Sequence, residues 1–171
     1  MIGRMHRFSL AAVVAMAAST STAHADQLQI DGGLSVIGVG YERTVRPHLA
    51  LQAEAFVFGT YFLPWFDLGD ETKGLGLGVR GTWFADASQR GLYVTPYLRV
   101  VAPDDESITD LGGSGFTTGV FAGWAFGLSS RLDLRIGAGV QYIRVRVETA
   151  AGDSLSSTPF VALDATLGYR L

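Results

Sequence analysis

The stretch LDLRIGAGVQY, residues 132–142, decides the fold that we expect for this chain. Apolar residues occupy every second position in it, and polar residues or glycines lie between them. Because successive side chains of a β-strand point to opposite faces, this alternation predicts a strand with one apolar and one polar face. The apolar face holds Leu132, Leu134, Ile136, Ala138, Val140 and Tyr142, and the other holds Asp133, Arg135, Gly137, Gly139 and Gln141.

The same alternation recurs along most of the chain, notably in residues 49–61, 74–85 and 161–171. Counted back from the C-terminus, seven strands are expected at 158–171, 132–147, 115–128, 91–101, 74–85, 49–61 and 36–45. Because single-chain bacterial barrels have an even number of strands, we expect an eighth strand at 26–33, with a tight turn near Gly32 to Ser35.

The connections between these strands alternate in length. Short ones are expected at 45–48, 87–90 and 129–131, and long ones at about 62–73, 102–114 and 149–157. Short turns alternating with long loops are typical of outer-membrane barrels, whose turns face the periplasm and whose loops face outward. The sequence therefore predicts an all-β fold, an eight-stranded antiparallel up-and-down transmembrane β-barrel.

The composition restricts the chemistry of the chain. Its 171 residues suit one domain, with 48% hydrophobic residues, 17% charged residues and a formal net charge of −3. The absence of Cys excludes disulfides, thiolate metal sites, cysteine catalysis and lipoprotein anchoring. A slightly acidic balance with a single Lys, Lys73, argues against nucleic acid as a partner.

Residues 1–25 have the pattern of a secretory signal peptide. Arg4 and Arg7 form a basic start, residues 10–18 form an apolar stretch, and Ala23-His24-Ala25 forms a small-x-small cleavage site. The apolar stretch is shorter than the roughly 20 residues that a membrane-spanning helix needs. We expect cleavage after Ala25, export through the periplasm to the outer membrane, and one barrel domain at 26–171.

The polar faces of the strands carry charges of both signs, and we expect these faces to line the barrel interior. An eight-stranded barrel is just wide enough for side chains to fill it, and an unpaired buried charge costs several kcal/mol. The sequence therefore predicts an interior network of ion pairs and hydrogen bonds without an open aqueous channel. Its predicted members are Glu42, Glu54, Arg80, Arg99, Asp133, Arg135, Asp164 and Arg170.

Aromatic residues recur on the apolar faces near the strand ends. Membrane interfaces favour two such girdles around an apolar band, whereas a soluble sandwich with one buried face per sheet does not explain them. The predicted girdle near the short turns consists of Tyr41, Trp83, Trp124 and Tyr169, and the one near the long loops consists of Tyr61 and Tyr142.

One expected long loop is unusually rich in aromatics. It contains more aromatic residues than a soluble loop needs, namely Tyr61, Phe62, Trp65 and Phe66. Exposed apolar patches of this kind often mark contact with a partner or a membrane. The alternative interpretation is that strands continue beyond the membrane and this segment caps the barrel.

Several motifs resemble those of a known class of protein. Residues 119–145 combine a Gly-x-x-x-Gly-aromatic strand, a Leu-Ser-x-Arg turn and a Gly-x-Gly-x-x-Tyr strand, and Gly40-Tyr41-Glu42 and residues 93–97 add to the pattern. Together they resemble the small eight-stranded outer-membrane β-barrel proteins of Gram-negative bacteria. The resemblance implies an outer-membrane location and no catalytic residue. It departs at Leu171, because such barrels usually end on a Phe or Trp that the insertion machinery reads.

Other chemical motifs carry little weight. Gly76-x-Gly78-x-x-Gly81 matches a dinucleotide-binding pattern, but it lies inside an alternating strand rather than between a strand and a helix. His48 is the one His after residue 25, beside Pro47 in a short turn, where it has no nucleophile to activate. The acidic run Asp104-Asp105-Glu106 fits no EF-hand spacing and is interpreted as a solvated loop. We predict no enzyme activity, no cofactor and no metal.

The function predicted from the sequence is a structural or interaction role in the outer membrane, with acidic surface loops and a closed polar interior. The expected partners are membrane lipid, lipopolysaccharide and the outer-membrane insertion machinery, and the expected state is a monomer. Two alternatives stay open: a small barrel that binds or passes an apolar ligand, and an envelope enzyme that modifies lipid.

Overall fold

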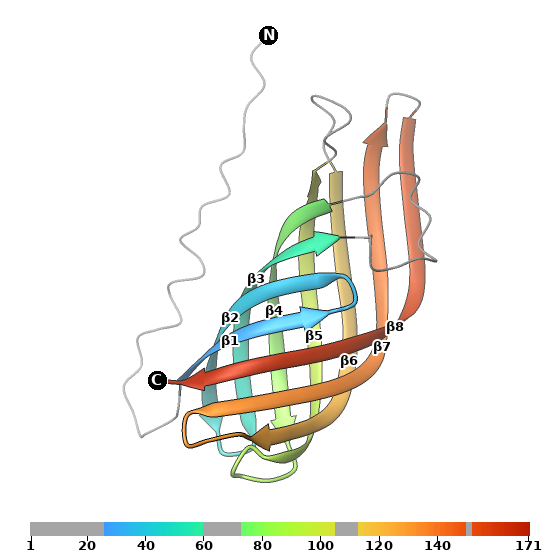
Figure 1. Cartoon of the computed structure of the whole chain (residues 1–171). Helices are drawn as coiled ribbons and strands as arrows, with labels where there is room; N and C mark the ends of the chain where they lie inside the picture. The colour runs from blue at the N-terminus through green and yellow to red at the C-terminus, as the bar shows by residue number, and fades with distance from the viewer. Residues whose placement is uncertain (1–25, 60–72, 105–112, 150–151) are drawn as a thin grey trace.

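Eight antiparallel strands form one closed barrel in the structure, a computed structural model that describes residues 26–59, 73–104, 113–149 and 152–171 (Figure 1). Each strand pairs with the next, and β1 pairs with β8 to close the ring. The predicted all-β, eight-stranded antiparallel barrel is confirmed. The strands are β1 Asp26–Gly33, β2 Val36–Arg46, β3 Leu49–Gly59, β4 Lys73–Phe84, β5 Gly91–Asp104, β6 Gly113–Gly127, β7 Leu132–Thr149 and β8 Gly152–Arg170.

The closure of the barrel depends on the hairpin of β1 and β2, whose existence was inferred from strand parity. β1 lies between β2 and β8, with Leu28 opposite Tyr41 on one side and Tyr169 on the other. Only residues 34–35 separate β1 from β2, as expected for the tight turn. The backbone N–H of Gly59 donates to the carbonyl of Ser35 at 3.0 Å, which ties this turn to the end of β3.

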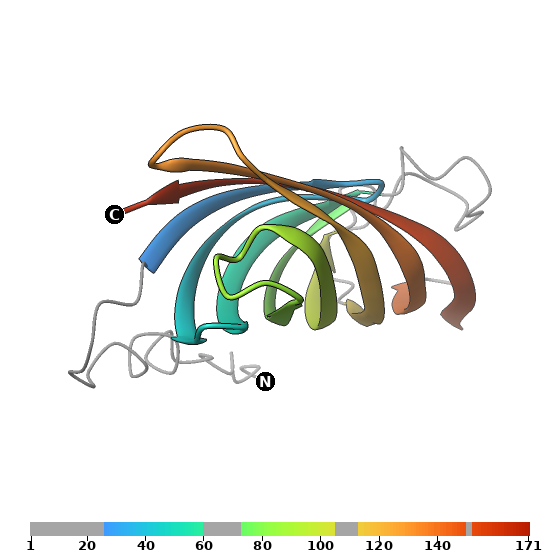
Figure 2. The ribbon, with the colours of Figure 1, turned by 90° about the horizontal axis from the view of Figure 1, so that it is seen from below.

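The connections β2–β3, β4–β5 and β6–β7 lie at one end of the barrel, here named the turn side, together with the C-terminal end of β8 (Figure 2). The two-residue connection of β1 and β2 lies at the other end. The opposite end is named the loop side. Gln89 in the β4–β5 connection has a φ of 59°, and Gly91, the first residue of β5, has a φ of 80°, so the chain reverses through the left-handed region. The backbone N–H of Ser88 donates to Oδ1 of Asp86 at 2.7 Å, which lowers the pKa of the Asp86 carboxyl.

One predicted boundary was wrong. The expected loop at 149–157 is largely strand, because β7 continues to Thr149 and β8 begins at Gly152, with these two residues paired. β1 pairs with β8 only from Asp164 onward, so the β7–β8 hairpin extends well past β1 and β2 on the loop side (Figure 1). The physical reason lies in residues 143–147, IRVRV, whose alternating β-branched residues continue the strand.

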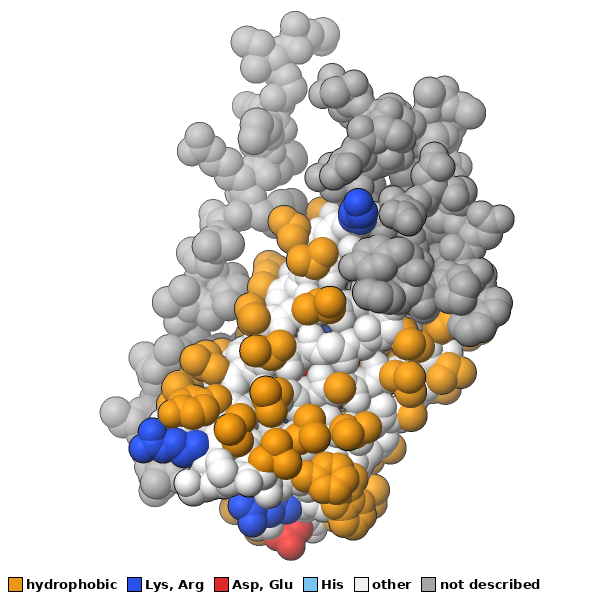
Figure 3. Space-filling model, in the orientation of Figure 1, with side chains coloured by type: hydrophobic (Ala, Val, Ile, Leu, Met, Phe, Trp, Pro, Cys, Tyr) orange, Lys and Arg blue, Asp and Glu red, His pale blue; other side chains and the backbone are white. Residues whose placement is uncertain are grey.

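The outer face of the barrel is apolar over most of its height (Figure 3). Its exposed large hydrophobic side chains range from 38% exposed, as at Tyr41, to 71% exposed, at Leu75. On β7 the outward positions from Leu132 to Tyr142 are apolar, and the intervening polar side chains point inward and are buried. No helix among the described residues is long and apolar enough to cross a membrane.

The polarity of β7 reverses immediately after Tyr142. Ile143 and Val145 point inward and are fully buried, and Arg144 and Arg146 point outward and are exposed. The strand therefore keeps its apolar side outside for 11 residues, 132–142, and then turns its apolar side inward. The inward face is buried on both sides of Tyr142, so what changes at this height is the kind of side chain on each face.

Glycines permit close contact between neighbouring strands inside the barrel. A Cβ on Gly139, which points inward from β7, would lie 2.8 Å from the carbonyl carbon of Val120 and 2.9 Å from Cα of Phe121, both backbone atoms of β6. Gly81 is an outward glycine of β4, where a Cβ would meet only Cδ2 of Leu51 at an ordinary 3.5 Å.

We expect Gly139→Ala to lower the free energy of unfolding by about 1–3 kcal/mol, because backbone cannot move aside as a flexible side chain can. Gly81→Ala is the matched control and should change stability by less than about 0.5 kcal/mol. Urea unfolding of the two refolded variants, followed by tryptophan fluorescence, measures the difference. Equal stability of the two variants would contradict the close packing of β6 on β7.

Candidate functional site

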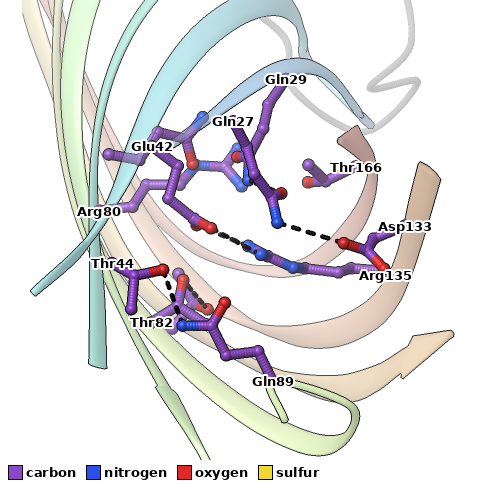
Figure 4. A network of polar contacts seen from close by, with 12 residues as sticks. Gln27, Gln29, Glu42, Thr44, Arg80, Thr82, Gln89, Asp133, Arg135 and Thr166 are labelled. Atoms are coloured by element: carbon purple, nitrogen blue, oxygen red, sulfur yellow. Dashed lines mark hydrogen bonds and ion pairs between the residues drawn. The ribbon is translucent and has the colours of Figure 1, made fainter. Parts of the chain in front are cut away.

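The interior of the barrel holds charged side chains from strands that are far apart in the sequence. They form two groups, and Figure 4 shows part of both. The turn-side network consists of Glu42, Asp133, Arg135 and Arg170, and the loop-side network consists of Asp31, Glu54, Arg80, Arg99 and Asp164. Each member occupies an inward position of its strand, which follows from the two-residue period.

Arg80 on β4 is the centre of the loop-side network. Its Nε lies 3.0 Å from Oε2 of Glu54, and its Nη1 lies 2.9 Å from Oδ1 of Asp164 and 3.5 Å from Oδ1 of Asp31. The side chain of Arg80 is only 3% exposed. A guanidinium has five N–H donors in a rigid fork, which suits it to bridge several carboxylates in a confined interior.

Glu54 connects Arg80 to a second arginine. Nε and Nη2 of Arg99 lie 2.6 Å and 3.1 Å from the two oxygens of Glu54. Asp31 accepts hydrogen bonds from Gln52 at 2.6 Å and Thr166 at 2.8 Å. The loop-side network thus has three carboxylates and two guanidiniums, and neutral side chains of β3 and β8 donate hydrogen bonds to Asp31.

The turn-side network balances its charges. Arg135 donates to both oxygens of Glu42 at 2.6 Å and 2.7 Å, a bidentate pair that spans the barrel from β7 to β2. Arg170 donates from Nε to Oδ2 of Asp133 at 2.7 Å. Gln27 donates to the same carboxylate oxygen at 3.2 Å (Figure 4). The Arg170 side chain is 25% exposed, which places this pair at the turn-side rim.

Aromatic rings fill the interior between the ion pairs. Tyr97 stacks on Phe121 with ring centroids 4.8 Å apart. The guanidinium carbon of Arg99 lies 4.8 Å from the Tyr97 ring centroid and 5.4 Å from that of Phe56. Arg135 lies similarly over Phe84 at 4.9 Å. These contacts bury the flat faces of the guanidiniums while their edges bond to carboxylates.

Apolar side chains occupy the interior beyond the loop-side network. One cluster contains Val36, Phe56, Phe58 and Val101, and a second contains Ile143 and Val145 with Leu34 and Phe160 packed against them. Phe58 is 1% exposed and Val101 6% exposed, so these side chains pack closely rather than border open space. The described part of the interior changes from charged to apolar along the barrel axis.

The structure places the predicted site residues as follows. All eight predicted network residues point inward, and each takes part in an ion pair with another predicted member. The girdle residues Tyr41, Trp83, Trp124, Tyr142 and Tyr169 point outward and are between 38% and 52% exposed. The remaining predicted contact residues, Tyr61, Phe62, Trp65 and Phe66, lie outside the described residues.

Sequence reasoning missed several members of the networks. Asp31, a third carboxylate near Arg80, was not among the predicted residues, and neither were its hydrogen-bond donors Gln52 and Thr166. A signal was present, because Gln27, Gln29 and Asp31 alternate with Leu28 and Ile30 in residues 26–33. Because the strand at 26–33 is predicted from the even number of strands alone, the predicted interior network includes none of its polar side chains.

A shallow groove of about 320 Å³ lies on the outer surface across β7, β8, β1 and β2. Gln29 and Gly40 contribute to its lining. Its apolar walls are formed by Leu28, Ile30, Val39, Leu132, Leu167 and Tyr169. Tyr169 also accepts a hydrogen bond from Nη1 of Arg131 at 3.1 Å on the turn side. The groove is on the outward face and is separate from the interior networks.

Among the described residues, no three His, Asp or Glu side chains are grouped so that they could hold a metal ion. His48 is directed at the barrel wall, where Nδ1 lies 2.9 Å from the carbonyl oxygen of Phe84. No protein-family model matches the chain, and no curated protein sequence matches it significantly.

Proposed function

We propose that this chain is an outer-membrane β-barrel protein with a structural or interaction role, held in lipid by its apolar outer face. The observation that carries the proposal is the reversal of polarity along β7. From Leu132 to Tyr142 the strand is apolar outside and polar inside, and from Ile143 it has the opposite arrangement. Lipid around the first part and water around the second account for both halves.

The height of the apolar belt supports this proposal. The 11 residues from Leu132 to Tyr142 agree with the roughly 9–11 residues that a tilted strand needs to cross a bilayer. Trp83, Trp124 and Tyr169 lie at the turn-side end of the belt, and Tyr142 lies at its loop-side end. Aromatic residues favour these two interfaces because their rings have an apolar body and a polar edge.

A soluble barrel has apolar side chains inside and polar side chains outside, the reverse of the arrangement along the belt. In water the outward hydrophobic side chains would stay exposed and add nothing to the stability of the fold, while the interior would hold nine charged groups in place of an apolar core. Thr118 illustrates adaptation to an apolar surrounding: it points outward, and its hydroxyl donates to the carbonyl of Tyr97 at 3.0 Å. This internal hydrogen bond removes the need for water.

Membrane fractionation together with gel migration tests the proposal. The expected result is recovery of the mature protein in the outer-membrane fraction, with different migration of heated and unheated samples in detergent gels, because folded barrels resist unfolding by detergent. A mature protein that is soluble in the periplasmic fraction without detergent would refute the proposal.

The packed interior leads to a second expectation, that the barrel conducts no large stable current. The ion pairs of Arg80 and Arg135 cross the interior, and the loop-side clusters add closely packed apolar side chains above them. Planar bilayer recordings of the purified protein measure the conductance. A large and long-lived channel would contradict a closed interior.

The alternative role, binding of an apolar ligand, has one observation in its favour, the apolar loop-side interior. Phe58, Val36 and Val101 are at most 6% exposed, however, and they pack against one another. We therefore favour the structural or interaction role.

A further inference from the structure

We propose that the outer groove across β7, β8, β1 and β2 binds an acyl chain of an anionic glycerophospholipid, whose phosphate binds Arg131. This inference rests on the proposed function and specifies a lipid partner for it. The site, named the lipid groove below, consists of the apolar groove of about 320 Å³ and the guanidinium of Arg131 at its turn-side end.

Strand register builds the apolar part of the lipid groove. Ile30 of β1 lies between Val39 of β2 and Leu167 of β8, and Leu28 of β1 lies opposite Tyr169 of β8. These five side chains point outward and are each at least 40% exposed. The volume is at the lower end of the roughly 300–1,000 Å³ of small-molecule pockets, which suits part of one acyl chain. Its apolar walls offer no partner to a polar occupant.

Arg131 is held at the turn-side end of the groove. It directly precedes Leu132, and its Nη1 donates to the hydroxyl of Tyr169 at 3.1 Å; the side chains of Leu132 and Tyr169 both line the groove. The side chain of Arg131 is exposed, and within the described part of the chain no carboxylate forms an ion pair with it. Because a guanidinium has five N–H groups, most of its donors are available to a phosphate.

The charges at this end of the four strands favour an anion. Five arginines, with three side-chain carboxylates and the terminal carboxylate of Leu171, lie there, namely Arg43, Arg46, Arg131, Arg135 and Arg170 with Asp26, Glu42 and Asp133. Glu42 and Asp133 form ion pairs with Arg135 and Arg170, and Asp26 accepts a hydrogen bond from Tyr41 at 2.6 Å.

The C-terminus lies beside the first strand, because the backbone N–H of Leu171 donates to the carbonyl of Asp26 at 2.9 Å. The signal-peptide cleavage expected after Ala25 would add an ammonium group at Asp26, next to that terminus. Cleavage therefore increases the excess of positive charge beside the groove.

The height of the site selects the lipid. Outer-membrane barrels place their short turns in the periplasm, so the turn side would meet the periplasmic leaflet, which consists of glycerophospholipids. The apolar belt of β7 begins at Leu132, so Arg131 lies at the level of the headgroups. A phosphate bound there would leave its acyl chain to follow the groove towards the middle of the belt.

The first test addresses the phosphate. Native mass spectrometry of the refolded mature protein, released from non-ionic detergent micelles containing phosphatidylglycerol, counts the bound lipids and gives their affinity. For R131Q we expect affinity at least about fivefold weaker than for the wild type, because the charge-assisted contact with the phosphate is lost. The control R46Q removes the same charge from another short turn and should stay within about twofold of the wild type. Diacylglycerol, which lacks the phosphate, should bind the wild type as weakly as phosphatidylglycerol binds R131Q.

The second test addresses the acyl chain. In I30W the indole would fill the groove, and we expect affinity for phosphatidylglycerol at least about fivefold weaker than for the wild type. The control V79W places the same side chain on the outer face of β4, outside the groove, and should stay within about twofold of the wild type.

Four results would overturn the inference and leave the proposed function intact. They are wild-type affinity of R131Q or of I30W in a variant that shows the heat-dependent gel migration of the wild type, an equal loss in either control, equal binding of diacylglycerol and phosphatidylglycerol, and a lipid-free dimer that I30W dissociates. The last would assign the groove to a second copy of the chain. A wild-type chain that forms no heat-modifiable barrel would contradict the proposed function itself, and the inference with it.

Discussion

Replacing Arg80 by Leu is expected to lower the free energy of unfolding by about 3–5 kcal/mol, the largest effect of any single substitution considered for this barrel. Arg80 contacts Asp31, Glu54 and Asp164, each at 3.5 Å or less. Without it, Arg99 would remain as the sole cation of the loop-side network against three buried carboxylates. The cost arises because charges in a low-dielectric interior are neither hydrated nor compensated.

Urea unfolding in phospholipid vesicles, followed by the fluorescence of Trp83 and Trp124, measures the effect. Arg46→Leu removes an exposed arginine on the turn side and should change stability by less than about 0.5 kcal/mol. Arg80→Leu combined with Asp164→Asn should recover part of the loss, because one uncompensated carboxylate disappears. If Arg80→Leu fails to fold, Arg80→Lys keeps the charge and should give a smaller, measurable loss. Wild-type stability of Arg80→Leu would contradict the network as a source of stability.

Placing an arginine in the middle of the outer belt is expected to cost about 2–4 kcal/mol in lipid vesicles. Val79 of β4 is suited to this test, because it points outward, is 53% exposed and lies between Lys73 and Trp83 at the two ends of the strand. In bilayer the guanidinium of Val79→Arg would lie in hydrocarbon. In water the same change at an exposed strand position would have little effect.

The control is the same substitution near the belt margin. Val45, an outward residue at the end of β2, is 38% exposed, and we expect Val45→Arg to cost less than about 1 kcal/mol because the charge reaches the interface. Both variants are compared by urea unfolding in vesicles. Equal, near-zero costs at the two positions would count against an outer surface buried in lipid.

Much of the architecture was accessible from local pattern. The alternation in 132–142 identified the inward side of β7 correctly, with Asp133 and Arg135 inside and Tyr142 outside. Parity of strand number correctly predicted a first strand at 26–33. The boundary at 149–157 was wrong, because a hairpin can extend past the ring of the barrel, and a pattern of polar and small residues there resembles a loop.

The pairing of the interior charges could not be obtained in this way. Sequence identified Arg135 and Glu42 as inward residues, but their bidentate pair joins positions 93 residues apart. Asp31 of β1 lies close to Arg80 of β4, although β2 and β3 separate these strands in the barrel. Partner choice depends on strand tilt and on the register of every intervening pair, and a two-residue period contains neither quantity.

The sequence by itself determined which side of each strand is apolar, because the direction of a side chain along a strand is a local property that repeats every two residues. Only the tertiary structure decided which charges meet and how far the hairpin of β7 and β8 extends past β1. Those features require the ring to close, because closure fixes the height of each residue relative to its neighbours.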